Sequence, residues 1–154
     1  MATKTIEIKE GCLVDIRTDA GSLLVDHFCE VGRDAGVRNL DPDWATLERL
    51  EDAERLYVLI AYQESECVGY CVSMLMQHTN NRTQVQLVND AMFIHPSVRK
   101  NGVGLEMIRC MEGIASELAA DCVWYAPTHS RLDQILACRD DYQGTHTVYS
   151  RKAQ

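Results

Sequence analysis

The spacing of apolar residues changes from segment to segment along this chain, and each spacing predicts an element of structure. Residues 12–18 (CLVDIRT) alternate apolar and polar side chains, which predicts a half-buried strand. Residues 20–32 and 41–55 carry apolar side chains three or four positions apart, and both segments are therefore predicted to be helices. One side of the first of these helices is formed by Leu23, Leu24, His27, Phe28 and Val31.

The centre of the chain contains three apolar segments separated by short polar turns. Residues 56–63 (LYVLIAYQ) are almost continuously apolar, which is typical of a strand buried on both faces. Two further strands are predicted at residues 66–78 and 84–95, because the polar segments ESE and NNRT precede them. The centre is therefore predicted to be an antiparallel meander.

The second half of the chain begins with the strongest helical pattern. Residues 103–120 have an apolar stripe at helical spacing, and a strand at 121–127, a helix at 130–139 and a strand at 145–152 are predicted to follow. No repeat or flexible linker interrupts the sequence, so residues 1–154 are predicted to form a single domain. The order of elements predicts an α/β fold in which helices cover a mixed sheet.

Composition and charge narrow the possible partners. The net charge of −8 and the pI near 5.0 argue against nucleic acid, because binding to phosphate backbones needs a cationic face. No apolar run approaches the length of a membrane-spanning helix, and the N-terminal residues show no secretory signal. We therefore expect a cytoplasmic protein that does not contact a membrane.

The chain contains seven cysteines, and none of them forms a C-x-x-C pair. Since no ligand pair has the spacing of a zinc site, the sequence predicts no metal centre. Instead of a zinc site, we favour a set of reduced thiols that fill apolar positions. The cysteines are Cys12, Cys29, Cys67, Cys71, Cys110, Cys122 and Cys138.

Residues 95–107 (HPSVRKNGVGLEM) combine glycines and cations between a predicted strand and a predicted helix. Gly102 and Gly104 allow a close approach to the backbone, and Arg99 and Lys100 add positive charge. A turn of this kind at a helix N-terminus suits a phosphate or pyrophosphate group. The alternative is an ordinary helix start in which the glycines serve only the turn. Two other phosphate-binding patterns, G-x-x-x-x-G-K-[ST] and G-x-G-x-x-G, are absent.

The same residues resemble the acyl-CoA signature of the GNAT (Gcn5-related N-acetyltransferase) family, [QR]-x-x-G-x-[GA]. Arg99-Lys100-Asn101-Gly102-Val103-Gly104 match this pattern, and Ile94-His95-Pro96 match the strand end and proline that usually precede it. The resemblance in element order extends over about residues 12–127. It implies a mixed, mostly antiparallel sheet of about six or seven strands flanked by about four helices.

The resemblance also implies a cofactor and its binding residues. Acetyl-CoA or another acyl-CoA would be the co-substrate. Its pantetheine arm would pair with the backbone of Met92, Phe93 and Ile94, where the strand separates from the one that follows. Backbone amides of the turn would hold the pyrophosphate, and the amine would attack the thioester directly. The residues of the turn are Arg99, Lys100, Asn101, Gly102, Val103 and Gly104.

The last third of the chain departs from the family pattern. The tyrosine that usually protonates the departing thiolate is replaced, because alignment on Tyr142 puts Ala137 or Cys138 at its position. His129 is our candidate for an acid or substrate contact, with Cys138, Tyr125 or water as alternatives. Each of these side chains can equally be structural.

The candidate for the general base is Asp90, which lies on the strand before the turn. An aspartate near a strand bulge can instead serve only as a hydrogen-bond acceptor. A group of acidic residues elsewhere can form a solvated helix face or attract a cationic amine. These residues are Glu48, Glu51, Asp52 and Glu54.

The sequence therefore leads to two hypotheses about function. The first is an acyl-CoA-dependent N-acyltransferase that acts on an amine of a small molecule or a protein. The second is a GNAT-fold binding protein that modulates a partner protein, as a phage-encoded protein in a host cytoplasm would. A homodimer remains open under both hypotheses.

Overall fold

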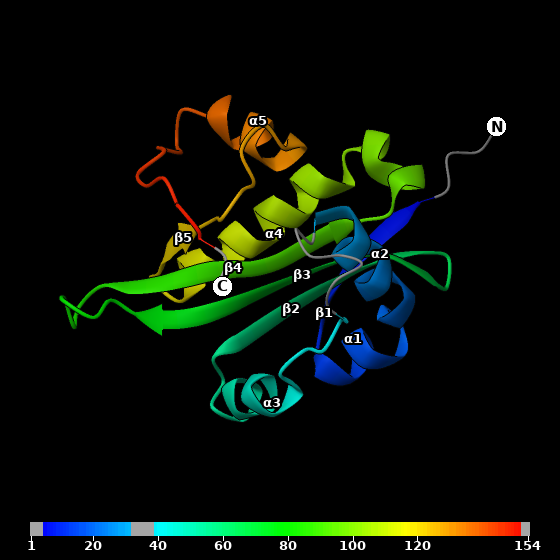
Figure 1. Ribbon diagram of the computed structural model, residues 1–154, viewed down its shortest axis with the longest axis horizontal. Coiled ribbons are helices and arrows are strands. Elements are labelled where there is room, and N and C mark those ends of the chain that lie inside the picture. Colours follow the sequence, from blue (N-terminus) through cyan, green and yellow to red (C-terminus); the bar gives the residue numbers. More distant parts are fainter. Residues whose placement is uncertain (1–4, 32–38, 152–154) are drawn as a thin grey trace.

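The computed structural model describes residues 5–31 and 39–151, which form a five-stranded sheet with helices on both faces (Figure 1). The strands are β1 (Ile6–Gly11), β2 (Leu56–Gln63), β3 (Glu66–Gln77), β4 (Val85–Ile94) and β5 (Asp121–Val123). The helices are α1 (Leu13–Thr18), α2 (Gly21–Val31), α3 (Trp44–Asp52), the 3₁₀ helix η1 (Pro96–Asn101), α4 (Val103–Glu117) and α5 (Arg131–Ala137).

The strands lie in the sheet in the same order as in the sequence. β1, β2, β3 and β4 are antiparallel to their neighbours, whereas β5 pairs with β4 in parallel. A parallel pair needs a crossover connection, and η1 and α4 provide it. The predicted meander and the β-α-β unit after it are both confirmed.

Two apolar layers lie on opposite faces of the sheet, because successive side chains of a strand point in opposite directions. In β2, Leu59 and Ala61 belong to the layer under α4, whereas Val58 and Ile60 belong to the layer under α1 and α2. This alternation confirms that residues 56–63 are a strand buried on both faces. The α4 layer also contains Met107 and Met111, which have no exposed surface.

The prediction of a strand at residues 12–18 is wrong, since residues 13–18 form α1. Leu13, Ile16 and Ala20 are all buried, and their spacing of three and four residues is helical. The carboxylate of Asp15 accepts the N–H of Cys12 at 2.7 Å and so caps the first turn. The strand lies earlier, at Ile6–Gly11, where half-buried Ile6 and Ile8 alternate with exposed residues.

The C-terminal part also differs from the expected six or seven strands and about four helices. β5 ends at Val123 rather than residue 127, and residues 145–151 form no strand; residue 152 lies outside the described residues. Val148 and Tyr149 are 74% and 91% exposed. Their side chains therefore pack against no neighbouring surface that would stabilise a strand. The helix count differs because α1 was missed and η1 precedes α4.

The cysteines of the described residues are unpaired thiols. Cys71 on β3 is fully buried, and this burial raises the pKa of its thiol to about 12, so it stays protonated. Over residues 5–31 and 39–151, no three histidine, cysteine or acidic side chains gather closely enough to bind a metal ion. The same residues include no helix with the length and apolar character needed to cross a membrane.

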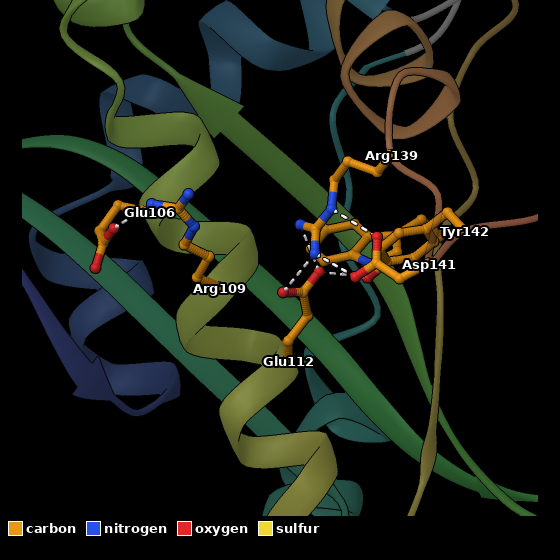
Figure 2. A network of polar contacts seen from close by, with 7 residues as sticks. Glu106, Arg109, Glu112, Arg139, Asp141 and Tyr142 are labelled. Carbon is orange, nitrogen blue, oxygen red and sulfur yellow. Dashed lines mark hydrogen bonds and ion pairs between the residues drawn. The ribbon is translucent and has the colours of Figure 1, made fainter.

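A polar network attaches the C-terminal segment to α4 (Figure 2). Arg139 lies between Glu112 of α4, at 2.8 Å from its Oε1, and Asp141, at 2.6 Å from its Oδ2. The hydroxyl of Tyr142 donates to Oε1 of Glu112 at 2.7 Å and accepts Nε1–H of Trp124 at 2.9 Å. The network therefore connects α4, the segment after β5 and the segment after α5.

We expect Arg139→Met to lower the free energy of unfolding by about 1–3 kcal/mol. The side chains of Arg139 and Glu112 are only 23% and 24% exposed, so the substitution leaves a poorly solvated carboxylate without its cation. Denaturant unfolding measures the effect. Arg109→Met is the matched control, because its 3.6 Å pair with Glu106 is well exposed (Figure 2) and should contribute less than about 1 kcal/mol. Equal losses in the two variants would contradict a structural role for the network.

Candidate acetyl-CoA site

A β-bulge interrupts the pairing of β3 with β4. Val72 pairs with Ala91 and Ser73 pairs with Asn89, which leaves Asp90 as an extra residue of β4 without a partner. Bulges bend a strand and redirect its side chains, and they occur frequently beside active sites. Asp90, the candidate base, therefore lies at one of two irregular points of the sheet, the other being the register shift between Ala61 and Tyr62 in the β2–β3 pairing.

The side chain of Asn89 holds the bulge in place. This residue is only 4% exposed, and its Nδ2 lies 3.1 Å from the carbonyl oxygen of Val72 and 3.2 Å from that of Ala91. Sγ of Cys71 and Oγ of Ser73 are further neighbours, at 3.3 and 3.5 Å. A side-chain amide thus replaces the hydrogen bonds that the interrupted ladder cannot make.

β4 and β5 separate just before the bulge. Their parallel pairing covers Gln86–Val88 and Asp121–Val123 and goes no further. The N–H of His95 donates to the carbonyl of Val68 on β3 at 2.8 Å. Because backbone groups of successive residues alternate in direction, those of Met92 and Ile94 point toward the side on which β5 has ended. This edge is where the sequence places the pantetheine arm.

The turn after β4 leads into α4 through a left-handed residue. Gly102 has φ 76° and ψ 0°, and a Cβ placed there would have no atom within 4 Å. The first N–H groups of α4 follow directly, and an α-helix offers them no internal acceptor. At Gly104 an added Cβ would lie 3.7 Å from Cε of Met92, so this glycine packs beside the end of β4. Gly102 is exposed, whereas Gly104 is only partly exposed.

The two cations of the turn have different surroundings. Nε of Arg99 donates to the carbonyl of Ile94 at 2.8 Å, and Nη2 pairs with Glu30 of α2 at 2.5 Å. Its guanidinium also lies over the ring of Phe93, 5.3 Å from the centroid. Arg99 therefore links the turn to α2, whereas the exposed Lys100 and Asn101 remain at the surface of η1.

Asp90 shares its surroundings with two side chains of the α2 layer. Asp90 is an exposed position of β4, but the protein on one side of its carboxyl partly excludes water and raises its pKa, and the charge of His27 acts in the opposite direction. Burial lowers the pKa of His27, and burial together with the charge of Asp90 raises that of Tyr70. A carboxyl with a raised pKa beside a neutral imidazole is an arrangement suited to proton transfer near neutral pH.

His129 lies in a different environment. It is exposed at φ 64°, and its backbone N–H donates to Asp133 of α5 at 2.8 Å. Its described contacts are with residues 133 and 134, so the structure does not bring it together with Asp90. Of the alternative acids, Tyr125 follows β5 and is 63% exposed, and Cys138 lies exposed at the end of α5.

A small cavity of about 210 Å³ lies between the start of α2, the β2–β3 turn and η1. Its lining includes the carboxylates of Asp19, Asp26 and Glu66. This negative charge disfavours the binding of a phosphate group in the cavity.

Three side chains of the candidate site were not identified as site residues from the sequence. His27 appeared there only as a member of an apolar helix stripe, and Asn89 and Tyr70 appeared only within strands. One signal was available for His27, because a titratable ring within an otherwise apolar stripe needs a polar partner. The roles of Asn89 and Tyr70 depend on a bulge and a strand register, which the sequence pattern does not reveal.

The family model described as the acetyltransferase (GNAT) family matches residues 26–139, well over half of the chain. The chain belongs to this family. It is therefore an acetyltransferase by class, and acetyl-CoA is the co-substrate of that class. No curated protein matches the sequence significantly.

Solved structures share the fold at low sequence identity. An aminoglycoside acetyltransferase from an uncultured soil metagenomic sample superposes with a TM-score of 0.67 at 19% identity, over 96% of this chain and 97% of that one. A ribosomal-protein-alanine N-acetyltransferase from Brucella melitensis biovar Abortus 2308 gives 0.67 at 17%, over 96% and 99%. A predicted acetyltransferase from Clostridium acetobutylicum, solved with acetyl-CoA, gives 0.64 at 18%, over 94% and 96%.

The raised pKa of Asp90 leads to a prediction about stability. Since the folded protein binds this proton more tightly than the unfolded chain, ionisation of Asp90 opposes folding as the pH rises above the ordinary value of 3.8. Asp90→Asn should therefore unfold at higher denaturant concentration than the wild type at neutral pH, and the gain should vanish below pH 3.8. Asp140→Asn, at another exposed position but outside the sheet and after α5, is the control and should change little at either pH. A gain independent of pH would show that the carboxyl charge is not its cause.

Proposed function

We propose that the protein transfers an acetyl group from acetyl-CoA to an amine of a small molecule or a protein, by direct attack of the amine on the thioester. The observation that carries this proposal is the separation of β4 from β5 at a bulge, directly before an uncovered glycine turn. The separation leaves a backbone edge for the pantetheine arm, and the turn leaves N–H groups for the pyrophosphate.

In this proposal the backbone binds the cofactor. The N–H groups at the start of α4 hold the pyrophosphate, with the positive end of the helix dipole behind them. Lys100 adds charge at the surface, whereas Arg99 acts mainly by fixing the turn to α2. The N–H of Met92, the nearer to the bulge of the two that point toward β5, would polarise the acyl carbonyl.

The amine must lose a proton before or during the attack. Asp90 lies at the bulge, and its raised pKa makes it a better base than an ordinary aspartate. The amine nitrogen forms a bond to the carbonyl carbon, the proton passes to Asp90 directly or through water, and the C–S bond breaks. The departing thiolate takes a proton from water or from an exposed group such as Tyr125 or His129.

The acceptor is expected to be cationic before it reacts. Asp90 and the acidic cavity beside η1 both attract positive charge, and the net charge of −8 favours the approach of a cation. Known acceptors within the shared fold include aminoglycosides and a ribosomal protein, as the names of the similar structures state. We propose an amine acceptor of small-molecule or protein origin without choosing between the two.

Two variants at one position test where the cofactor binds. Asn and Asp both tolerate the left-handed conformation of Gly102, and their side chains have nearly the same size. Gly102→Asp should bind acetyl-CoA at least about tenfold more weakly than Gly102→Asn, because only Asp places negative charge beside the pyrophosphate. Calorimetric titration measures both affinities, and equal values would place the pyrophosphate elsewhere.

A release assay for free CoA, run with acetyl-CoA and a panel of cationic amines and peptides, tests the reaction itself. We expect at least one amine to accelerate CoA release, and Asp90→Asn to lower that rate by about 10²-fold with acetyl-CoA affinity unchanged. Tight acetyl-CoA binding without transfer to any amine would instead favour the alternative of a binding protein that modulates a partner.

A further inference from the structure

His27 of α2 is a half-buried imidazole with a defined set of neighbours. Its ring stacks on Phe93 of β4, with centroids 5.2 Å apart and planes 22° apart. Its Nδ1 lies 2.6 Å from the hydroxyl oxygen of Tyr70 on β3. Tyr70 and Phe93 are partners in the β3–β4 ladder, so two strands and one helix fix the ring.

The hydrogen bond to Tyr70 determines which nitrogen of His27 carries the proton. Tyr70 is only 1% exposed, and a buried phenol needs an acceptor for its O–H. Nδ1 of His27 is the acceptor that the described residues supply. A phenol that donates to Nδ1 leaves the proton of a neutral imidazole on Nε2. His27 then presents an N–H donor on the side of the ring opposite Tyr70.

Asp90 lies on β4 three residues before Phe93, the ring on which His27 stacks, and it is the extra residue of the bulge. The charges of Asp90 and His27 also affect each other's pKa. No direct hydrogen bond joins the two side chains, which are both within the described part of the chain. One water molecule, or the amine of an acceptor, would connect Nε2–H to the carboxylate. The carboxylate gains a donor that stabilises its charged form.

We propose that His27 is a positioning residue for Asp90: held by Tyr70 as a neutral ring protonated on Nε2, it donates through one water to the Asp90 carboxylate. The inference rests on the proposed role of Asp90 as the base. His27 keeps that carboxylate ionised and directed toward the amine, and it takes no proton itself.

Three charged groups affect the pKa of His27. Glu30 on α2 and Asp90 on β4 raise its pKa, whereas Arg99 lowers it. Burial is the largest cause and lowers it, so the ring is neutral at neutral pH. Tyr70, facing it from β3, stays protonated because burial raises its pKa. In the proposed arrangement a neutral donor is therefore available to Asp90 over the pH range in which a base is needed.

Nuclear magnetic resonance on the wild-type protein without ligands tests the tautomer. The ¹⁵N shifts of the two ring nitrogens of His27 distinguish Nε2–H from Nδ1–H. We expect Nε2–H in the wild type and a mixture of the two forms in Tyr70→Phe, which removes the donor to Nδ1. An Nδ1–H ring in the wild type overturns the proposal, and this measurement needs neither a substrate nor activity.

The titration of Asp90 tests the connection between the two residues. The ¹³C shift of its carboxyl gives the midpoint in the wild type, in His27→Phe and in His27→Gln, whose amide retains an N–H donor near the position of Nε2. We expect the midpoint to rise in His27→Phe and to return toward the wild-type value in His27→Gln. Equal midpoints in the three proteins overturn the proposal.

Kinetics with an amine that supports transfer supply the functional measurement. In His27→Phe the acid limb of the kcat/KM profile should move to higher pH, and kcat/KM should fall about tenfold, the effect of one hydrogen bond to a charged group. The KM for acetyl-CoA should not change. A lower rate with an unmoved acid limb overturns the positioning role, whereas a failure to bind acetyl-CoA in the wild type contradicts the proposed function instead.

Discussion

The site depends on a single irregularity in an otherwise regular ladder, the extra residue at position 90 of β4. The pairing of β4 with β5 ends at Val88, just before this residue, so the edge of β4 beyond it is not occupied by β5. The bulge leaves backbone carbonyls without ladder partners, and the buried amide of Asn89 donates to two of them. Asn89 therefore stabilises the bulge at which the candidate base lies.

The two faces of the sheet contribute differently around this point. On the α4 face, the apolar layer that includes Met107 and Met111 holds the helix whose N-terminus follows the glycine turn. On the α2 face, the polar groups are gathered beside Asp90, and Arg99 crosses from the turn to Glu30. Phe93 contacts both His27 and Arg99, so one aromatic ring contributes to the positions of His27 and of the turn.

The sequence predicted the parts of the structure whose causes are local. Gly102 has a left-handed conformation that glycine adopts easily, residues 56–63 are buried on both faces, and α4 carries an apolar stripe. Each of these features can be recognised from residue type or spacing in the sequence. Residues 12–18 were misassigned because a short amphipathic helix and a short strand give similar patterns. The predicted strand at 145–152 is wrong for its described residues, 145–151. A strand needs a partner edge and a surface to pack against, and the exposed Val148 packs against no such surface. The pairing of His27 with Tyr70 joins residues 43 positions apart, so no local pattern could reveal it.

The two tryptophans of the chain lie in opposite apolar layers, and this separation makes the protein its own optical reporter. Trp124 lies just beyond β5, and its indole is fixed by a hydrogen bond to Tyr142. Trp44 lies on the other face, beneath the guanidinium of Arg17, 4.6 Å from the ring centroid. Emission from Trp124 therefore responds to events where β4 and β5 separate, while Trp44 supplies an internal reference from a distant part of the same molecule.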